Sequence, residues 1–211
     1  MTMLLGIDFD NTIVSYDAIF ARLAIEAGYI DDVPSGGKTA IRDVVRAAHG
    51  DEAWQLLQAD AYGARMGEAL LNQGFSAFVS SARRLGVPLV VVSHKSVFSH
   101  VAAAGPNLRY AALAWMRANR FFEPGGLGFG VDDIYFEGTR CEKVARIREL
   151  GCTHFVDDLP EVFAEKSFPN GAMRILYAPT GDRADGSADA VVSDWFDLRD
   201  LLFAHAERAV A

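Results

Sequence analysis

Cysteine, basic residues and long hydrophobic runs are all scarce in this sequence. Its 211 residues include two cysteines, Cys141 and Cys152, too few for a disulfide framework, so we expect reduced thiols. Lysine and arginine number 20 against 28 aspartates and glutamates, which gives a formal net charge of -8. Binding along a polyanion needs clustered positive charge, so the composition argues against a general nucleic-acid-binding protein.

No apolar run reaches the roughly 20 residues that a helix needs to cross a bilayer, so we expect no membrane partner. The first ten residues, MTMLLGIDFD, have no basic region and include two acids, unlike a signal peptide. We therefore expect a cytoplasmic protein. The hydrophobic share of 51% is enough for one sizeable core, in one domain or in one domain with an insertion.

Short apolar runs alternate with helix-like segments along most of the chain. Helices are expected at residues 75–85, 140–150 and 195–208, the first two ending before a glycine. Short strands separated by helices predict an α/β fold, a three-layer Rossmann-like parallel sheet covered on both faces. The expected strands are residues 4–9 (LLGIDF), 88–93 (PLVVVS), 134–137, 153–156 (THFV) and 173–177 (MRILY).

Residues 15–74 do not follow this alternation. They contain three helix-like segments, at 16–27, 39–48 and 52–66, and no convincing strand. We therefore expect an α/β core made of residues 1–14 and 75–211, with a small helical cap, residues 15–74, inserted after the first strand. A lid over the active end is the preferred interpretation, and extra packing on the sheet is the alternative.

Acidic side chains directly follow the first expected strand. Side chains two residues apart in an extended chain point the same way, so Asp8 and Asp10 should enter one site while Phe9 turns to the core. Ligands of open α/β sheets bind beyond the carboxyl ends of the strands, where this pair falls. Further polar residues close later strands or begin a helix, namely Ser93 with His94 and Lys95, Lys143, and Asp157 with Asp158.

This order of motifs resembles the haloacid dehalogenase-like superfamily. Its pattern is a strand followed by DxDxT or DxDxV, a strand ending in Ser or Thr, a lysine, and a strand ending in acids. The matching residues here are Asp8, Asp10 and Thr12, then Ser93, Lys143, and Asp157 with Asp158. The resemblance implies a hydrolase of the phosphatase type, and the helical insert stands where the superfamily has its C1-type cap.

The chemistry of phosphate esters explains why these residue types would be needed. Phosphate monoesters are extremely slow to hydrolyse unaided, so a nucleophile must be held in line and the phosphoryl charge neutralised. Asp8 can attack phosphorus to form an aspartyl-phosphate, and Asp10 can act as general acid and then base. Ser93 and Lys143 can contact phosphoryl oxygens, with Lys166 as the alternative lysine. An acid at position 10 disfavours dehalogenation, because the dehalogenases of the superfamily lack it.

A divalent cation would offset the repulsion between the clustered acids. Two like charges 4 Å apart repel by about 4 kcal/mol at an effective dielectric constant of 20. Hard oxygen ligands favour Mg²⁺. The resemblance implies that its ligands are the Asp8 carboxylate, the Asp10 carbonyl and one acid of the late pair. We favour Asp158 as the direct ligand over Asp157, and the reverse stays open.

The remaining candidates are less specific. Thr12 could bind substrate or only fix the turn, and His94 and Lys95 could reach a phosphate or the leaving group, or be ordinary loop residues. The sequence therefore predicts a Mg²⁺-dependent phosphatase acting on a small phosphorylated metabolite. The alternative is a signalling phospho-acceptor or a non-catalytic module on the same fold. Oligomeric state and physiological substrate are not indicated.

Overall fold

The chain folds into two compact units. The computed structural model describes residues 2–99, 101, 105–181 and 186–210. The core unit comprises Met1–Ile13, Leu71–Lys95 and Arg120–Ala211, and the helical unit comprises Val14–Leu70 and Ser96–Asn119. Each unit is therefore built from segments that are distant in the sequence.

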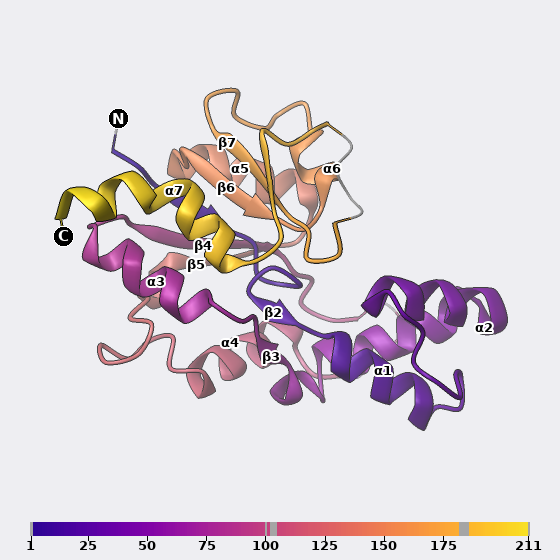
Figure 1. Cartoon of the computed structure of the whole chain (residues 1–211). Helices are drawn as coiled ribbons and strands as arrows, with labels where there is room; N and C mark the ends of the chain where they lie inside the picture. Colours follow the sequence, from indigo (N-terminus) through magenta and orange to yellow (C-terminus); the bar gives the residue numbers. More distant parts are fainter. Residues whose placement is uncertain (1, 100, 102–104, 182–185, 211) are drawn as a thin grey trace. The chain divides into compact units, whose positions relative to one another are not determined.

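The core unit is organised around a six-stranded parallel sheet, of which β4, β5, β6 and β7 are labelled in Figure 1. The strand order is β5-β4-β1-β6-β7-β8. The first strand along the chain lies inside the sheet, between β4 and β6. The strands are β1 (Leu5–Ile7), β4 (Leu89–His94), β5 (Ile134–Glu137), β6 (His154–Asp157), β7 (Met173–Tyr177) and β8 (Ala190–Val192). The predicted strands 134–137 and 173–177 coincide with β5 and β7, whereas β8 was missed.

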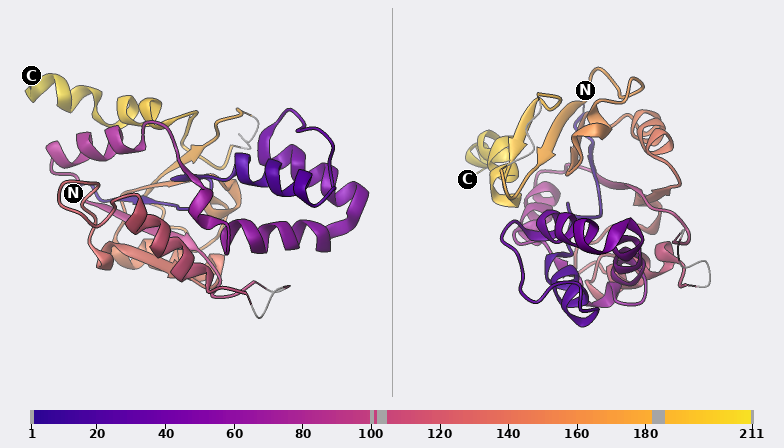
Figure 2. Two further views of the ribbon diagram at one scale, coloured as in Figure 1. Left: turned by 90° about the horizontal axis from the view of Figure 1, so that it is seen from below. Right: turned by 90° about the vertical axis from the view of Figure 1, so that its right-hand side faces the viewer.

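Helices cover both faces of this sheet, which confirms the predicted three-layer α/β class (Figure 2). One face carries α5 (Arg140–Leu150) and the short α6 (Pro160–Phe163), which share a hydrophobic cluster with Val90, Phe155 and Leu176. The other face carries α3 (Phe75–Arg84) and α7 (Trp195–Val210), which pack against each other through aromatic rings. The 3-10 helix η2 (Val131–Asp133) leads into β5.

The helical unit consists mainly of α1 (Asp17–Glu26), α2 (Gly37–Tyr62), the 3-10 helix η1 (Met66–Glu68) and α4 (Leu108–Ala118). Gly50 interrupts α2 with a non-helical φ of 86°, a conformation that glycine adopts without steric cost. The break separates the two helices predicted at 39–48 and 52–66. Short strands β2 (Val14–Ser15) and β3 (Leu70–Leu71) pair with each other in a two-stranded sheet.

Residues 96–119 lie in the helical unit, whereas the sequence-based boundaries left them in the core. The indole Nε1 of Trp115 donates a buried hydrogen bond of 2.8 Å to the Ala69 carbonyl. The Leu108 amide donates to the Val97 carbonyl at 2.8 Å, which anchors the start of α4. The contact of Trp115 with Ala69 joins two segments that are distant in the sequence, which local periodicity does not reveal.

Within the described part of the chain, no helix combines the length and the apolar character needed to cross a bilayer.

Gly6, in the middle of β1, provides a test of how tightly the core is packed. A Cβ added there would lie 2.6 Å from Cδ2 of Phe155 and 3.0 Å from Sγ of Cys152. Phe155 is fully buried and has little room to move. We expect Gly6→Ala to lower the free energy of unfolding by about 1–3 kcal/mol, measured by urea denaturation. Gly171→Ala is the control, since a Cβ there meets nothing within 4 Å, and equal stability of the two variants would contradict the packing.

Candidate active site

Strand register brings the early and late acids to the same edge of the sheet. Ile7 of β1 pairs with Val91 of β4 on one side and with Val156 of β6 on the other. The Asp8 amide continues this pairing by donating to the Val156 carbonyl at 2.9 Å. Asp8 and Asp157 each follow a residue of one register pair, so their side chains enter one site at the carboxyl ends of β1 and β6.

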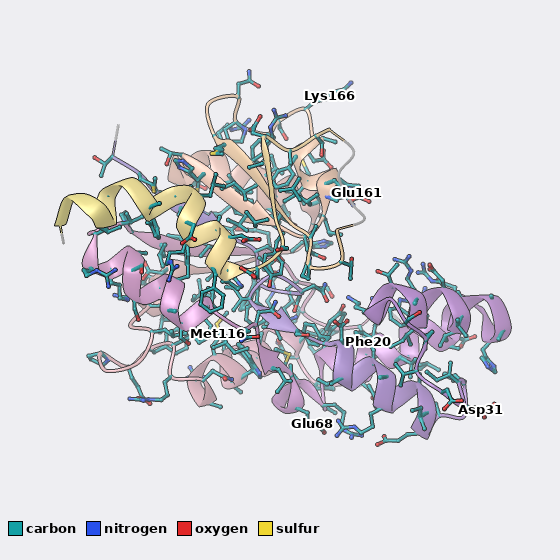
Figure 3. All side chains as sticks on the ribbon, in the orientation of Figure 1. Phe20, Asp31, Glu68, Met116, Glu161 and Lys166 are labelled. Carbon is teal, nitrogen blue, oxygen red and sulfur yellow. The ribbon has the colours of Figure 1, made fainter. Side chains whose placement is uncertain are left out.

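Lys143 lies between these two acids. Its Nζ is 2.5 Å from Oδ1 of Asp8 and 2.6 Å from Oδ2 of Asp157, and its side chain is 2% exposed. Helix α5 delivers it from the first turn, where the Thr139 side chain caps the Glu142 amide at 3.1 Å. The alternative lysine, Lys166, is exposed after α6 (Figure 3), so Lys143 is the lysine in the acidic cluster.

Both acids of the late pair are buried. Both oxygens of Asp157 have partners: Oδ2 accepts from Lys143, and Oδ1 accepts from the Leu159 amide at 3.0 Å. Asp158 follows β6 and is also buried, at 6% exposure. Asp157 therefore has protein donors at both oxygens, and the preference for Asp158 as the direct metal ligand stays a prediction.

Asp8, Asp157 and Asp158 form a cluster suited to a hard divalent cation. Each offers one carboxylate oxygen, and the three oxygens lie within 4.8 Å of one another. The Lys143 ammonium pairs with two of the three carboxylates, so with all three ionised the cluster carries excess negative charge where water is largely excluded. Mg²⁺ prefers oxygen donors of this kind, and one or two carboxylates are often enough to hold it. Three neighbouring carboxylates therefore offer sufficient ligands for this ion.

The acids of this cluster are strongly perturbed. Burial raises the pKa of Asp8 to about 7, and the Lys143 ammonium limits the rise. Burial likewise raises the pKa of Asp157 to about 6, again opposed by Lys143. Burial alone would lower the pKa of Lys143, but the neighbouring Asp157 and Asp8 carboxylates outweigh it and the pKa is raised. Lys143 therefore stays charged, and a bound cation would stabilise the carboxylate forms of the acids.

Asp10 forms a second ion pair, with Lys95. Nζ of Lys95 lies 2.9 Å from Oδ1 and 2.8 Å from Oδ2 of Asp10. The side chain of Lys95 is 3% exposed and that of Asp10 is 18% exposed. The charge of Asp10 also contributes to raising the pKa of Asp8, which places the second pair close to the first. The sequence suggested a substrate role for Lys95 and did not reveal this pairing.

Two buried hydroxyls lack a hydrogen-bond partner among the described residues, Oγ1 of Thr12 and Oγ of Ser93. Ser93 is 1% exposed near the end of β4, and Thr12 is fully buried just after the acids. Leaving a buried polar group without a partner costs free energy, so such groups in native proteins usually serve a ligand or a water. An anion with several acceptor oxygens would satisfy them.

His94 is placed less specifically. Its side chain is exposed, and its Nε2 lies 3.1 Å from the Gly138 carbonyl at the β5–α5 connection. Burial of part of the ring lowers the pKa of His94, and the charge of Lys143 lowers it further. His94 is therefore near the cluster, but its observed partner is a backbone carbonyl.

Two residues that the sequence did not single out hold the turn after the acids. The Asn72 side-chain amide donates to the Thr12 carbonyl at 2.8 Å, and Nε1 of Trp195 donates to the same oxygen at 3.2 Å. Asn11, within this turn, has a φ of 62°, in the left-handed region that asparagine tolerates better than most residues. Asn72 and Trp195 are remote in sequence from the acid motif, so no local pattern could have identified them.

Solved structures of several other proteins have a similar architecture. A haloacid dehalogenase (HAD) family hydrolase from Deinococcus radiodurans R1, with bound phosphate and sodium, superposes with a TM-score of 0.63 at 15% identity, covering 97% of this chain and 96% of that one. A haloacid dehalogenase-like protein from Streptococcus pneumoniae gives 0.60 at 13% identity, over 95% and 98%. A HAD phosphatase from Thermococcus onnurineus gives 0.50 at 15%, over 96% and 98%.

No protein-family model matches the sequence, and no curated protein does. At these identities the structural likeness establishes the fold and leaves the chemistry to the site. The chain therefore has the fold of the haloacid dehalogenase-like hydrolases, with a buried acidic triad able to bind a metal. The resemblance seen in the motifs is confirmed at the level of the fold.

Removing the ammonium between Asp8 and Asp157 should be strongly destabilising. Lys143→Met leaves two buried carboxylates without their shared counter-ion, and we expect a loss of about 3–5 kcal/mol in the free energy of unfolding without added metal. Both acids have pKa values raised above the unfolded value near 3.8, so their charged forms destabilise the fold as pH rises. The loss should therefore be larger at pH 8 than at pH 5, measured by urea denaturation.

Lys166→Met is the matched control, because Lys166 is exposed and should change stability by less than about 0.5 kcal/mol. Adding Asp8→Asn to Lys143→Met should recover part of the lost stability, since one of the uncompensated charges is gone. A Lys143→Met protein as stable as the wild type at pH 8 would show that the ammonium does not compensate these acids.

Proposed function

We propose that this protein is a Mg²⁺-dependent phosphatase that hydrolyses a small phosphomonoester through an aspartyl-phosphate on Asp8. The observation that carries the proposal is the convergence of Asp8 and the late acids around Lys143, with their oxygens within 4.8 Å of one another. Asp8 and Lys143 are 135 residues apart in the sequence, and burying the charges of these residues together needs a reason.

Asp8 is the nucleophile. Its carboxylate attacks phosphorus, the bond from phosphorus to the leaving oxygen breaks, and an aspartyl-phosphate forms. Lys143 holds Asp8 through Oδ1 and supplies positive charge beside the reacting group. Ser93 and Thr12 have the buried, unpartnered hydroxyls that phosphoryl oxygens would satisfy.

Asp10 carries the protons. As an acid it gives a proton to the leaving oxygen, and as a base it takes one from the water that attacks the intermediate. Water then breaks the bond between Asp8 and phosphorus, releasing inorganic phosphate and restoring the carboxylate. The spacing of two residues after Asp8 supports this role, because side chains two residues apart in an extended chain point the same way.

A bound Mg²⁺ would supply charge neutralisation for the phosphoryl group and the clustered acids. Its proposed ligands are the carboxylates of Asp8 and Asp158 and the backbone carbonyl of Asp10, with Asp157 held behind them by Lys143 and the Leu159 amide. The neighbour from Deinococcus radiodurans R1 is described with bound phosphate, and that from Thermococcus onnurineus as a phosphatase, which supports phosphate chemistry on this fold.

The helical unit is proposed as the cap that selects the substrate. The chain enters it directly after Ile13 and again after Lys95, each within three residues of a site side chain, Asp10 or Ser93. Insertions at such points can vary without disturbing the sheet. A small phosphorylated metabolite handled in the cytoplasm is the proposed substrate class.

Replacement of the nucleophile tests the proposal directly. Asp8→Asn keeps the size of the side chain but removes the attacking carboxylate, so release of p-nitrophenol from p-nitrophenyl phosphate with Mg²⁺ should fall at least about 10³-fold. Circular dichroism should show the fold retained. Asp132→Asn, at an exposed acid before β5, is the control and should keep wild-type turnover.

Two outcomes would count against a phosphatase. Substantial turnover by Asp8→Asn would remove Asp8 from its role. A wild-type protein that becomes phosphorylated on Asp8 without releasing phosphate over many cycles would instead be a phospho-acceptor module.

Metal binding should be visible as added stability. Mg²⁺ binds the folded site and not the unfolded chain, so at 100 times its dissociation constant it should stabilise the wild type by about 2.7 kcal/mol. Thermal melts with Mg²⁺ and with a chelator measure the difference. Asp158→Asn should lose most of this response while Asp132→Asn keeps it, and a melting temperature indifferent to Mg²⁺ in the wild type would contradict a metal site.

A further inference from the structure

Lys95 is a buried cation to which the proposed chemistry has not yet assigned a role. Among the described residues the buried charged side chains are Asp8, Lys95, Lys143, Asp157 and Asp158, and all but Lys95 belong to the proposed metal and phosphoryl cluster. Its backbone is fixed as well, because its amide donates to the Glu137 carbonyl at 2.9 Å, one residue beyond the last register pair of β4 and β5.

The Lys95 side chain is directed at Asp10. Its Nζ donates to both carboxylate oxygens, at 2.9 and 2.8 Å, and lies 5.6 Å from the centre of the Phe9 ring. A carboxylate held through both oxygens cannot rotate without breaking a charge-assisted hydrogen bond. The contact therefore fixes the orientation of the Asp10 carboxylate, and the ammonium offsets the charge of that carboxylate.

The exposed fractions of the two side chains indicate that Lys95 acts through Asp10 and not on the substrate. The Asp10 side chain is 18% exposed, whereas that of Lys95 is 3% exposed. A ligand entering the site would thus find Asp10 more accessible than the ammonium that holds it. Burying an unpaired ammonium costs free energy, so the ion pair between Lys95 and Asp10 is favoured over a Lys95 side chain released from Asp10.

We propose that Lys95 is a positioning residue that holds the Asp10 carboxylate in place for hydrolysis of the aspartyl-phosphate. The inference rests on the function proposed above. In this step the water oxygen bonds to phosphorus, the bond from Asp8 to phosphorus breaks, and the water proton passes to Asp10. The two hydrogen bonds from Lys95 fix where both oxygens of Asp10 lie, which assigns Lys95 to the step in which Asp10 must be aimed at the attacking water.

The test uses p-nitrophenyl phosphate with Lys95→Met in the full-length protein with Mg²⁺. p-Nitrophenolate leaves without needing an acid, so formation of the intermediate should be little affected. Hydrolysis should slow, lowering kcat roughly 10- to 100-fold, less than the 10²–10⁴ that a whole general base contributes. KM should fall with kcat and leave kcat/KM nearly unchanged. Rapid mixing should then show a burst of p-nitrophenol, and acid quenching should trap more phosphoenzyme than in the wild type.

Three further variants sharpen the result. Lys95→Arg keeps the charge and should restore part of kcat. Lys95→Met combined with Asp10→Asn should be no slower than Asp10→Asn alone, because both changes remove the same function. Lys166→Met, at an exposed lysine of the core unit, should behave as wild type. If Lys95→Met melts below the assay temperature, Lys95→Gln replaces it with the same expectations.

Two results would overturn the inference while leaving the phosphatase proposal standing. A raised KM with unchanged kcat would show that Lys95 binds substrate. A lower kcat without phosphoenzyme accumulation would show that it does not serve hydrolysis of the intermediate. If the wild type itself forms no phosphoenzyme and releases no p-nitrophenol, the proposed function fails, and the inference fails with it.

Discussion

The ammonium of Lys143 between Asp8 and Asp157 is the interaction on which the site depends. Both carboxylates are buried, and burial without a counter-ion would favour their neutral forms, which are poor nucleophiles and poor cation ligands. Helix α5 supplies the charge from its first turn, directly beside the strand ends. One ammonium among three carboxylates is a partial compensation. It allows the fold to form with the acids in place and leaves enough negative charge to bind a divalent ion.

The two early acids, Asp8 and Asp10, have different lysine partners. Asp8 and Asp10 both lie just beyond the end of β1, yet each meets a different lysine: Lys143 from α5 for Asp8, and Lys95 from the end of β4 for Asp10. Because β1 lies between β4 and β6, helices and loops from both sides of it can reach the site. An edge strand would have neighbours on one side only and could not be served by two independent cations in this way.

Residues with a local signal were predictable, and those defined by distant contacts were not. The runs at 134–137 and 173–177 coincide with β5 and β7, and Gly151 ends α5 as its sequence indicated. The edge strand β8 has three residues, too few for a visible alternation. The position of α4 depends on contacts such as that of Trp115 with Ala69. Sequence order identified Lys95 as a site candidate, but its pairing with Asp10 depends on side-chain direction and depth, which no spacing rule encodes.

Burying charged groups costs free energy, and this cost indicates that the acidic cluster serves a purpose other than folding. The three structural neighbours described above share only 13–15% identity with this chain, so the fold needs little more than apolar residues with the right periodicity. Hydrophobic side chains at the positions of Asp8, Lys143 and Asp157 would satisfy that need equally well or better, because a buried ion cluster seldom adds stability over an apolar one. The sheet instead carries its buried charges at the carboxyl ends of its inner strands, beside two hydroxyls without partners among the described residues. Such an arrangement is expected of a chain shaped by chemistry at this edge and not by folding alone.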